Sequence, residues 1–261
     1  MTERATLQIR QQNAVRWIVI DRPEKLNALN QEVIEALDEA FGEAAADPQC
    51  RVVVLTGAGD RAFVAGADIA ELQALEPGEA EAFVRRGHEL MDRIEGLGKP
   101  VLAAINGFAL GGGCELALAC TLRFAADSAR IGLPEVKLGL LPGYGGTQRL
   151  ARLVGRGRAL EMMLGGEPVT AARALEWGLV NGTAPAEELH ALVSGWAEKL
   201  ASGAPLAMEG ILSAVHEGVD LPMADGLEVE RERFARICSS EDMREGTAAF
   251  LEKRAASFRG R

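Results

Sequence analysis

The sequence predicts an α/β protein with a helical C-terminal region. Short apolar segments rich in β-branched residues alternate with segments of helical periodicity over about the first 200 residues. Beyond Ala204-Pro205 only helical patterns remain, and no linker rich in Pro, Gly or Ser separates the two parts. We therefore expect residues 1–204 to form the α/β core and residues 205–261 to form a helical region attached to it.

The first elements have clear periodicities. Residues 15–21 (VRWIVID) resemble a strand, and residues 29–46 carry apolar residues at the spacing of an amphipathic helix that Asn27 or Asn30 could cap. Residues 51–56 (RVVVLT) are almost all apolar, which is typical of a strand buried on both faces.

The alternation then continues with shorter elements. In order, the expected elements are a helix at 79–95, a strand at 101–105, a short apolar helix at 114–120, strands at 122–126 and 129–133, and helices at 205–215, 221–239 and 240–253. No fixed sequence period is visible, so the residues alone do not indicate a regular solenoid.

Composition excludes several broad classes. The chain has 261 residues, is 48% hydrophobic and carries a net charge of −10, so it is neither disordered nor suited to bind a nucleic acid in bulk. The N-terminus lacks the pattern of a signal peptide, and no apolar run approaches the ~18 residues of a membrane span. We expect a cytoplasmic protein without nucleic-acid or membrane partners.

Cysteine and glycine usage add detail. The four cysteines are scattered, with no CxxC and no His at ligand spacing, so we expect buried free thiols and no metal site. Glycine is in excess, with 30 residues or about 11%, against the usual ~7%.

Two glycine-rich clusters could bind an oxygen. Residues 111–113 are three consecutive glycines between a buried strand and an apolar helix, so the N–H groups at the helix start are open to a ligand. Residues 65–69 (AGADI) could present a second N–H. Two such donors converging on one oxygen would form an oxyanion hole. Alternatively, the small residues only permit tight packing.

Two glutamates occupy apolar surroundings near these clusters. Glu115 lies in an otherwise apolar helix, where an ionised carboxylate is costly unless it is paired or functional. Glu135 follows Pro134 and precedes a Gly-rich segment, although an acid in a first helical turn is also favourable there. Two carboxylates beside an oxyanion hole can activate a water and exchange a proton with a carbon next to a polarised carbonyl. The three histidines are expected on solvated helix faces.

These features resemble the crotonase (enoyl-CoA hydratase/isomerase) family, and the short-chain enoyl-CoA hydratases in particular. The similar segments span nearly the whole chain in order: RPEKLNALN (22–30), AFVAGADI (62–69), KPVLAAING (99–107), GGGCEL (111–116), PE (134–135), LPGYGGTQR (141–149) and FLEKR (250–254).

The resemblance implies a spiral of ββα units followed by helices that form trimers, with two trimers often making a hexamer. It implies reversible syn addition of water to a trans-2-enoyl-CoA, giving a 3-hydroxyacyl-CoA. No metal or redox cofactor is implied, and coenzyme A is the carrier of the substrate. The implied catalytic residues are Glu115 and Glu135 for the water and the α-proton, the N–H groups of Ala67 and Gly112 for the thioester oxygen, and Gly143 for placing the water. The implied acyl-CoA contacts are Lys25, Leu26, Ala65, Asp68 and Ile69, with Phe250 and Lys253 from a neighbouring subunit.

Other readings remain beside this one. Related isomerases usually keep an acid only at the position of Glu135, so the presence of Glu115 favours hydration over isomerisation or another acyl-CoA lyase or hydrolase reaction. Thr121 stands where the family commonly has Asp, and we expect it to make local hydrogen bonds. Residues 51–62 also fit a strand plus GxGxxA, a weak dinucleotide-binding signal. The basic run at 149–158 could suggest an RNA-binding role without catalysis.

Two regions carry the remaining expectations. The C-terminal helices hold more apolar side chains than three short helices can bury, which predicts a subunit interface. The apolar positions concerned are Ile211, Leu212, Leu221, Met223, Leu227, Phe234, Ile237 and Phe250. Residues 72–86 are expected to line the acyl pocket.

Overall fold

The strands form two sheets. The structure, a computed structural model, describes residues 2–4 and 6–261. The strands are β1 (Thr2–Arg4), β2 (Leu7–Gln12), β3 (Val15–Ile20), β4 (Val52–Gly57), β5 (Ala62–Val64), β6 (Val101–Ile105), β7 (Phe108–Leu110), β8 (Leu122–Ala126), β9 (Arg130–Gly132), β10 (Val169–Thr170) and β11 (Gly182–Ala184). Within the described residues, the larger sheet has the order β1-β2-β3-β4-β6-β8-β11 and the smaller has the order β10-β9-β7-β5.

The two sheets are built by a repeated step. Strands β4, β6 and β8 lie side by side and parallel in the larger sheet, and each is followed in the chain by β5, β7 or β9, which pair in parallel in the smaller sheet. A helix then returns the chain to the larger sheet. This is the spiral of ββα units that the family resemblance implies, and it exists although the sequence has no visible period.

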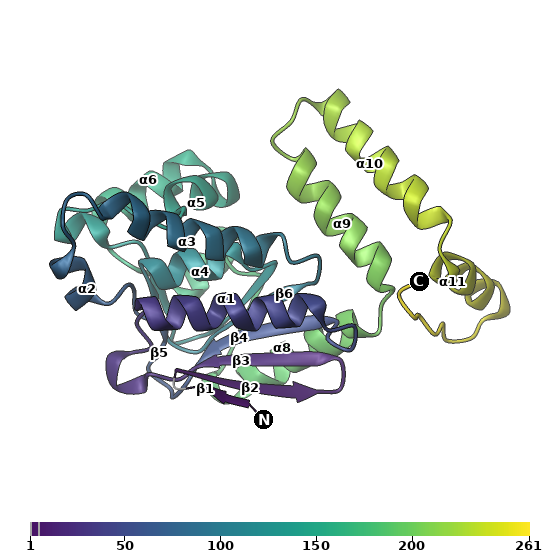
Figure 1. The fold of residues 1–261 in the computed structure, drawn as a ribbon, viewed down its shortest axis with the longest axis horizontal. Coiled ribbons are helices and arrows are strands. Elements are labelled where there is room, and N and C mark those ends of the chain that lie inside the picture. Colours follow the sequence, from purple (N-terminus) through teal and green to yellow (C-terminus); the bar gives the residue numbers. More distant parts are fainter. Residues whose placement is uncertain (1, 5) are drawn as a thin grey trace.

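The helices cover the sheets and extend beyond them (Figure 1). Their bounds are α1 (Gln31–Ala46), α2 (Ile69–Ala74), α3 (Ala80–Glu95), α4 (Gly112–Ala119), α5 (Gly146–Val154), α6 (Arg156–Gly165), α7 (Ala171–Glu176), α8 (Ala186–Ala201), α9 (Pro205–Gly218), α10 (Met223–Cys238) and α11 (Glu241–Glu252). Two short 3-10 helices, η1 (Pro23–Lys25) and η2 (Glu135–Leu138), lie in connections.

The predicted elements are present, with shifts at their ends. Helix α1 begins at Gln31 because the side chain of Asn30 accepts the N–H of Val33 at 3.0 Å and so caps it. Asn27 does not cap this helix. It is fully buried, and its amide donates to the carbonyls of Ala58 and Ala62, which ties the segment after η1 to the start of β5 and the loop before it.

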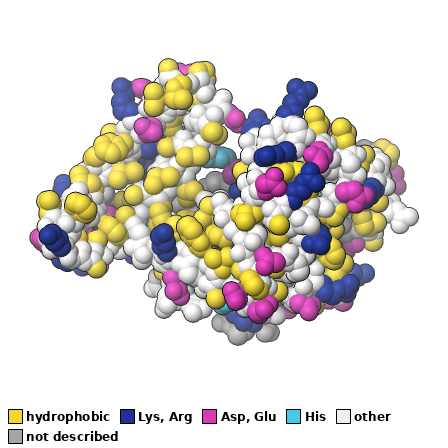
Figure 2. Space-filling view, turned by 180° about the vertical axis from the view of Figure 1, so that it is seen from behind, with side chains coloured by type: hydrophobic (Ala, Val, Ile, Leu, Met, Phe, Trp, Pro, Cys, Tyr) yellow, Lys and Arg dark blue, Asp and Glu magenta, His cyan; other side chains and the backbone are white. Residues whose placement is uncertain are grey.

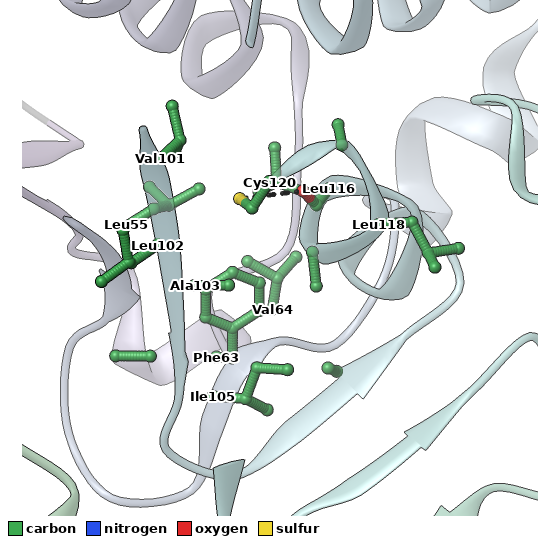
Figure 3. Close-up of a cluster of buried hydrophobic side chains, with 14 of the residues drawn as sticks. Leu55, Phe63, Val64, Val101, Leu102, Ala103, Ile105, Leu116, Leu118 and Cys120 are labelled. Atoms are coloured by element: carbon green, nitrogen blue, oxygen red, sulfur yellow. Dashed lines mark hydrogen bonds between the residues drawn. The ribbon is translucent and has the colours of Figure 1, made fainter. Parts of the chain in front are cut away.

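One part of the hydrophobic core lies where the two sheets meet α4. Strands β4 and β6 are buried on both faces, as their apolar runs predicted. Figure 3 shows Leu55 and Leu102 from these strands near Phe63 of β5 and Leu116 of α4. Cys120 lies in the same cluster, and its thiol donates to the carbonyl of Leu116 at 3.4 Å. Cys50 and Cys114 are buried free thiols as well, whereas Cys238 is only half-buried.

The C-terminal helices stand apart from the sheets. In Figure 1, α9 and α10 form a hairpin to one side, and α11 and the C-terminus lie at its open end, near the start of α9. The last residues are fastened to this region, because the buried carboxylate of Asp242 accepts the N–H groups of Arg259 at 2.6 Å and Gly260 at 2.8 Å. Arg51 of the core reaches the same tail by donating to the carbonyl of Phe258 at 2.8 Å. Among the helices described, none is long and apolar enough to cross a membrane.

Candidate active site

The parallel pairing of β5 with β7 brings the two glycine-rich clusters together. The loops that follow these strands start at Ala65 and Gly111, on the same edge of the smaller sheet. A Cβ at Gly112 would lie 3.5 Å from the backbone nitrogen of Ala67, so the two loops are in contact. Within the described residues, neither the N–H of Ala67 nor that of Gly112 donates a hydrogen bond. Two unpaired donors therefore lie side by side, as an oxyanion hole requires.

Glu115 is held one turn further along α4. Its carboxylate is 2% exposed, and its Oε1 accepts the backbone N–H groups of Tyr144 and Gly146, each at 2.7 Å. A Cβ at Gly146 would lie 3.0 Å from that oxygen, so a larger residue there would crowd the Glu115 side chain. Burial, together with the nearby charge of Glu135, raises the pKa of Glu115 to about 7, although these two N–H groups favour the anion.

Glu135 approaches the same place from η2. A Cβ at Gly111 would be 3.0 Å from its Oε1, so the carboxylate lies directly over the turn that opens α4. Its Oε2 is buried without a hydrogen-bond partner among the described residues. Burial raises the pKa of this carboxyl group as well. An unpaired buried carboxyl oxygen is costly, so it marks a position where a ligand or water would bind.

Both glutamates and both loops line one pocket of about 190 Å³. Gly143 is part of its wall, beside Tyr144. The rest is largely apolar and includes Leu72, Leu75, Ala80, Phe83 and Val84, all from the segment 72–86 that was expected to line the acyl pocket. The pocket thus has a polar end at the carboxylates and an apolar end at α2 and α3.

The other predicted contacts divide into two groups. Ala65 and Ile69 line the pocket. Leu26 adjoins it through its carbonyl, which accepts the N–H of Ala65 at 3.1 Å, while Lys25 is exposed on η1 and does not line it. Asp68 is engaged elsewhere. Its carboxylate caps α2 and pairs with Arg22 at 3.2 Å, so its role here is to hold the loop.

Phe250 and Lys253 lie far from this pocket within one subunit. Both are exposed on α11 or at its end, and α11 is on the far side of α9 and α10 (Figure 1). Their predicted role was in a neighbouring subunit, which a single chain does not test.

Sequence reasoning gave no role to Tyr144. Its backbone N–H holds Glu115, and its ring forms part of the pocket wall. Its place in the LPGYGGTQR motif after Glu135 was visible, but residues of α3 surround the ring, and no local pattern reveals that contact.

The competing functional readings lose their structural support. Residues 58–61 after β4 lead into strand β5 and not into a helix, so no dinucleotide-binding turn is present there. In the basic run, Arg149 pairs with Asp92 and Glu95, and Arg152 pairs with Asp220, so these cations are partly neutralised.

Two smaller expectations are confirmed. The hydroxyl of Thr121 accepts the N–H of Val101 at 3.1 Å, so it makes the local hydrogen bond expected at this position. His88, His190 and His216 all lie exposed on helices.

Comparisons with known proteins agree with this geometry. The sequence pattern of the enoyl-CoA hydratase/isomerase family matches residues 10–261. The chain is 42% identical to a short-chain-enoyl-CoA hydratase of Clostridium acetobutylicum, over 94% of each chain. It is also 42% identical to a crotonyl-CoA hydratase of Syntrophomonas wolfei, over 92% of this chain and 93% of that one. A crystal structure of an enoyl-CoA hydratase from Bacillus anthracis superposes with a TM-score of 0.95 at 38% identity, covering 98% of this chain and all of the other.

Proposed function

Because the chain belongs to the enoyl-CoA hydratase/isomerase family, we propose that it hydrates trans-2-enoyl-CoA thioesters reversibly to 3-hydroxyacyl-CoA. One observation supports this most directly. Buried Glu115 and half-buried Glu135, whose Oε2 is enclosed, line the same pocket as two unpaired backbone N–H groups. Hydration needs that combination, because it requires a base for water, an acid for carbon and donors for a developing oxyanion.

The donors act on the thioester oxygen. When water attacks C3, the π electrons move through C2 toward the thioester carbonyl, whose oxygen gains negative charge. The N–H groups of Ala67 and Gly112 bind this oxygen more strongly as its charge grows, which lowers the barrier. Removing one such donor typically costs ~3–4 kcal/mol of transition-state stabilisation.

The two glutamates differ in surroundings, which suggests how the protons move. Oε1 of Glu115 accepts two backbone N–H groups, and these favour a carboxylate that can accept a proton from water. Glu135 has an unpaired buried oxygen, which favours the protonated acid that can donate to C2. In the proposed step the O–C3 and C2–H bonds form on the same face as the C2=C3 π bond breaks. Glu115 takes the proton from the breaking O–H bond of water, and the O–H bond of Glu135 breaks to supply the proton at C2.

The test measures loss of the enoyl thioester absorbance of crotonyl-CoA. Glu115→Gln and Glu135→Gln should each lower kcat by about 10²–10⁴-fold and change KM much less, because each removes a proton-transfer group. Glu89→Gln, on the exposed face of α3, serves as the matched control. Wild-type protein that leaves the absorbance unchanged, or two fully active Gln variants, would refute the proposal.

Isomerisation is the second candidate within the family. The presence of two acids in the pocket favours hydration, because shifting a double bond needs only one group that moves a proton between carbons. A 3-enoyl-CoA substrate separates the two reactions. If its conversion to the 2-enoyl isomer exceeds hydration of crotonyl-CoA, the isomerase assignment replaces ours.

We also propose that the C-terminal helices assemble the protein into trimers and pairs of trimers. Large apolar side chains are exposed there, including Phe250 at 83%, Met223 at 78% and Phe234 at 69%. Figure 2 shows hydrophobic side chains gathered over this part of the molecule, on the left in that view. Exposed apolar surface of this kind is typical of subunit interfaces. Light scattering at micromolar concentration should give a trimer or hexamer, and a monomer would contradict the proposal.

A further inference from the structure

The ring of Tyr144 fills a slot that two glycines leave open. A Cβ at Gly87 of α3 would lie 2.0 Å from Cδ1 of the ring, and a Cβ at Gly112 would lie 3.3 Å from Cδ2. The ring is therefore held edgewise between α3 and the turn that carries one of the two oxyanion-hole donors. Phe83 packs on it with ring centroids 5.5 Å apart. Contacts with α3 on one side and with Gly112 on the other therefore fix the position of the ring.

The hydroxyl at the end of this ring has no partner. Tyr144 is 2% exposed, and its Oη is buried without a hydrogen bond among the described residues. A buried phenol normally finds a partner, and leaving it unpaired costs about 1–3 kcal/mol. A ligand in the pocket that Tyr144 lines would remove this cost by supplying the missing hydrogen-bond partner.

The direction of the side chain indicates which part of a ligand that is. The backbone of Tyr144 is fixed at Glu115, at the polar end of the pocket, and the ring runs from there past Gly112. Glu71 of α2 and Arg86 of α3 act electrostatically on its phenol, so the hydroxyl faces the side of the pocket that these two helices form. The hydroxyl is thus offered to the acyl chain past its reacting carbons.

The charges around the hydroxyl favour a neutral partner. Besides burial, the carboxylates of Glu115 and Glu71 raise the pKa of Tyr144, while Arg86 acts weakly in the opposite sense. A third carboxylate would be repelled by these two acids. A hydroxyl or carbonyl oxygen would not.

We propose that Tyr144, seated against Gly87, is a specificity-determining residue that selects short enoyl-CoA substrates carrying a neutral oxygen beyond C3 on the acyl chain. This inference rests on the proposed hydratase function. It adds a substrate class, because an apolar chain of equal length would leave the phenol unpaired, whereas a hydroxyl or carbonyl would satisfy it.

The kinetic test uses substrates that differ in one group. In 4-hydroxy-trans-2-butenoyl-CoA a hydroxyl replaces the terminal methyl of trans-2-pentenoyl-CoA, and 5-hydroxy-trans-2-pentenoyl-CoA and trans-2-hexenoyl-CoA form the next pair. For each pair, the ratio of kcat/KM values cancels any general effect of a substitution on rate. Tyr144→Phe should lower the hydroxy-to-methyl ratio about five- to tenfold for at least one pair, since it deletes one hydrogen bond. An unchanged ratio for both pairs would overturn the inference.

A second measurement does not depend on catalysis. Tyr144 is the single tyrosine of the chain, so protein labelled with ¹³C at tyrosine Cζ gives one signal. Saturating 4-hydroxybutanoyl-CoA or 5-hydroxypentanoyl-CoA should move that signal differently from pentanoyl-CoA or hexanoyl-CoA, which have no group to pair with the phenol. Equal shifts within both pairs would contradict the inference. If the wild-type protein hydrated no substrate but the shifts differed, the hydratase proposal alone would fail.

Discussion

Replacing the buried acid of α4 should make the protein more stable, increasingly so at high pH. In Glu115→Gln the side-chain oxygen can still accept the N–H groups of Tyr144 and Gly146, but the group can no longer ionise. In the wild-type protein, burial raises the pKa of Glu115 from 4.5 to about 7. The substitution therefore removes a titration that the folded state disfavours.

The size of the effect follows from that pKa. A raised carboxyl pKa means that the folded protein holds the proton more tightly than the unfolded chain. The stability that this protonated group contributes is therefore fully present below about pH 4.5 and is lost as the pH rises to about 7. A pKa difference of this size corresponds to about 3 kcal/mol above pH 7, and to less than about 1 kcal/mol at pH 5. The variant should thus gain about 2–3 kcal/mol over wild type between pH 5 and pH 9.

Urea denaturation at equal protein concentration, at pH 5 and pH 9, measures this gain. The difference between variant and wild type is the relevant quantity, because titrations common to both proteins cancel in it. Glu89→Gln, an exposed glutamate on α3, should show no such pH-dependent difference. A Glu115→Gln protein that is no more stable at pH 9 than at pH 5, relative to wild type, would refute the account of a desolvated carboxylate.

Three further predictions concern packing, the phenol and the C-terminal tail. Gly113→Ala should destabilise the protein by about 1–3 kcal/mol or prevent folding, because the new Cβ would lie 2.0 Å from the carbonyl oxygen of Val64. In the control Gly195→Ala, on α8, the new Cβ meets no atom within 4 Å, so thermal melts should show a neutral or stabilising effect. Burial raises the pKa of Tyr144, so at pH 10, where a free tyrosine is half ionised, its absorbance at 295 nm should remain that of the neutral phenol. The phenolate absorbance should appear only when the protein unfolds. Asp242→Ala should increase hydrogen exchange of the backbone N–H groups of Arg259 and Gly260, which then lose their acceptor.

The sequence predicted the elements that have a clear apolar pattern and missed several that lack one. Helix α1 and strands β4 and β6 have continuous or periodic apolar patterns, and each was predicted within about two residues. Strands β5 and β7 have three residues each, too few for a period, and they were not predicted. The N-terminal strand β2 was missed as well, because the exposed side chains at its end make the segment polar.

In the candidate site too, some residues could be predicted from the sequence and others could not. Glu115 and Glu135 stood out because acids are unusual in apolar segments, and both lie in the pocket. The slot for Tyr144 could not be predicted, since Gly87 precedes it by 144 − 87 = 57 positions and lies in another helix. Only the packing of α3 against the site brings the two together.

The excess of glycine has a double origin. Gly112 leaves a donor bare beside Ala67, as the sequence suggested. At Gly57, Gly107 and Gly113, however, a Cβ would meet a backbone oxygen at 2.0–2.3 Å, so these glycines are required where the chain passes closely between the two sheets and α4. The same close approach brings the loops after β5 and β7 into contact and so creates the pair of donors. The same close packing thus serves both the fold and the site, and a substitution that separates the strands should disrupt the proposed oxyanion hole without changing either donor residue.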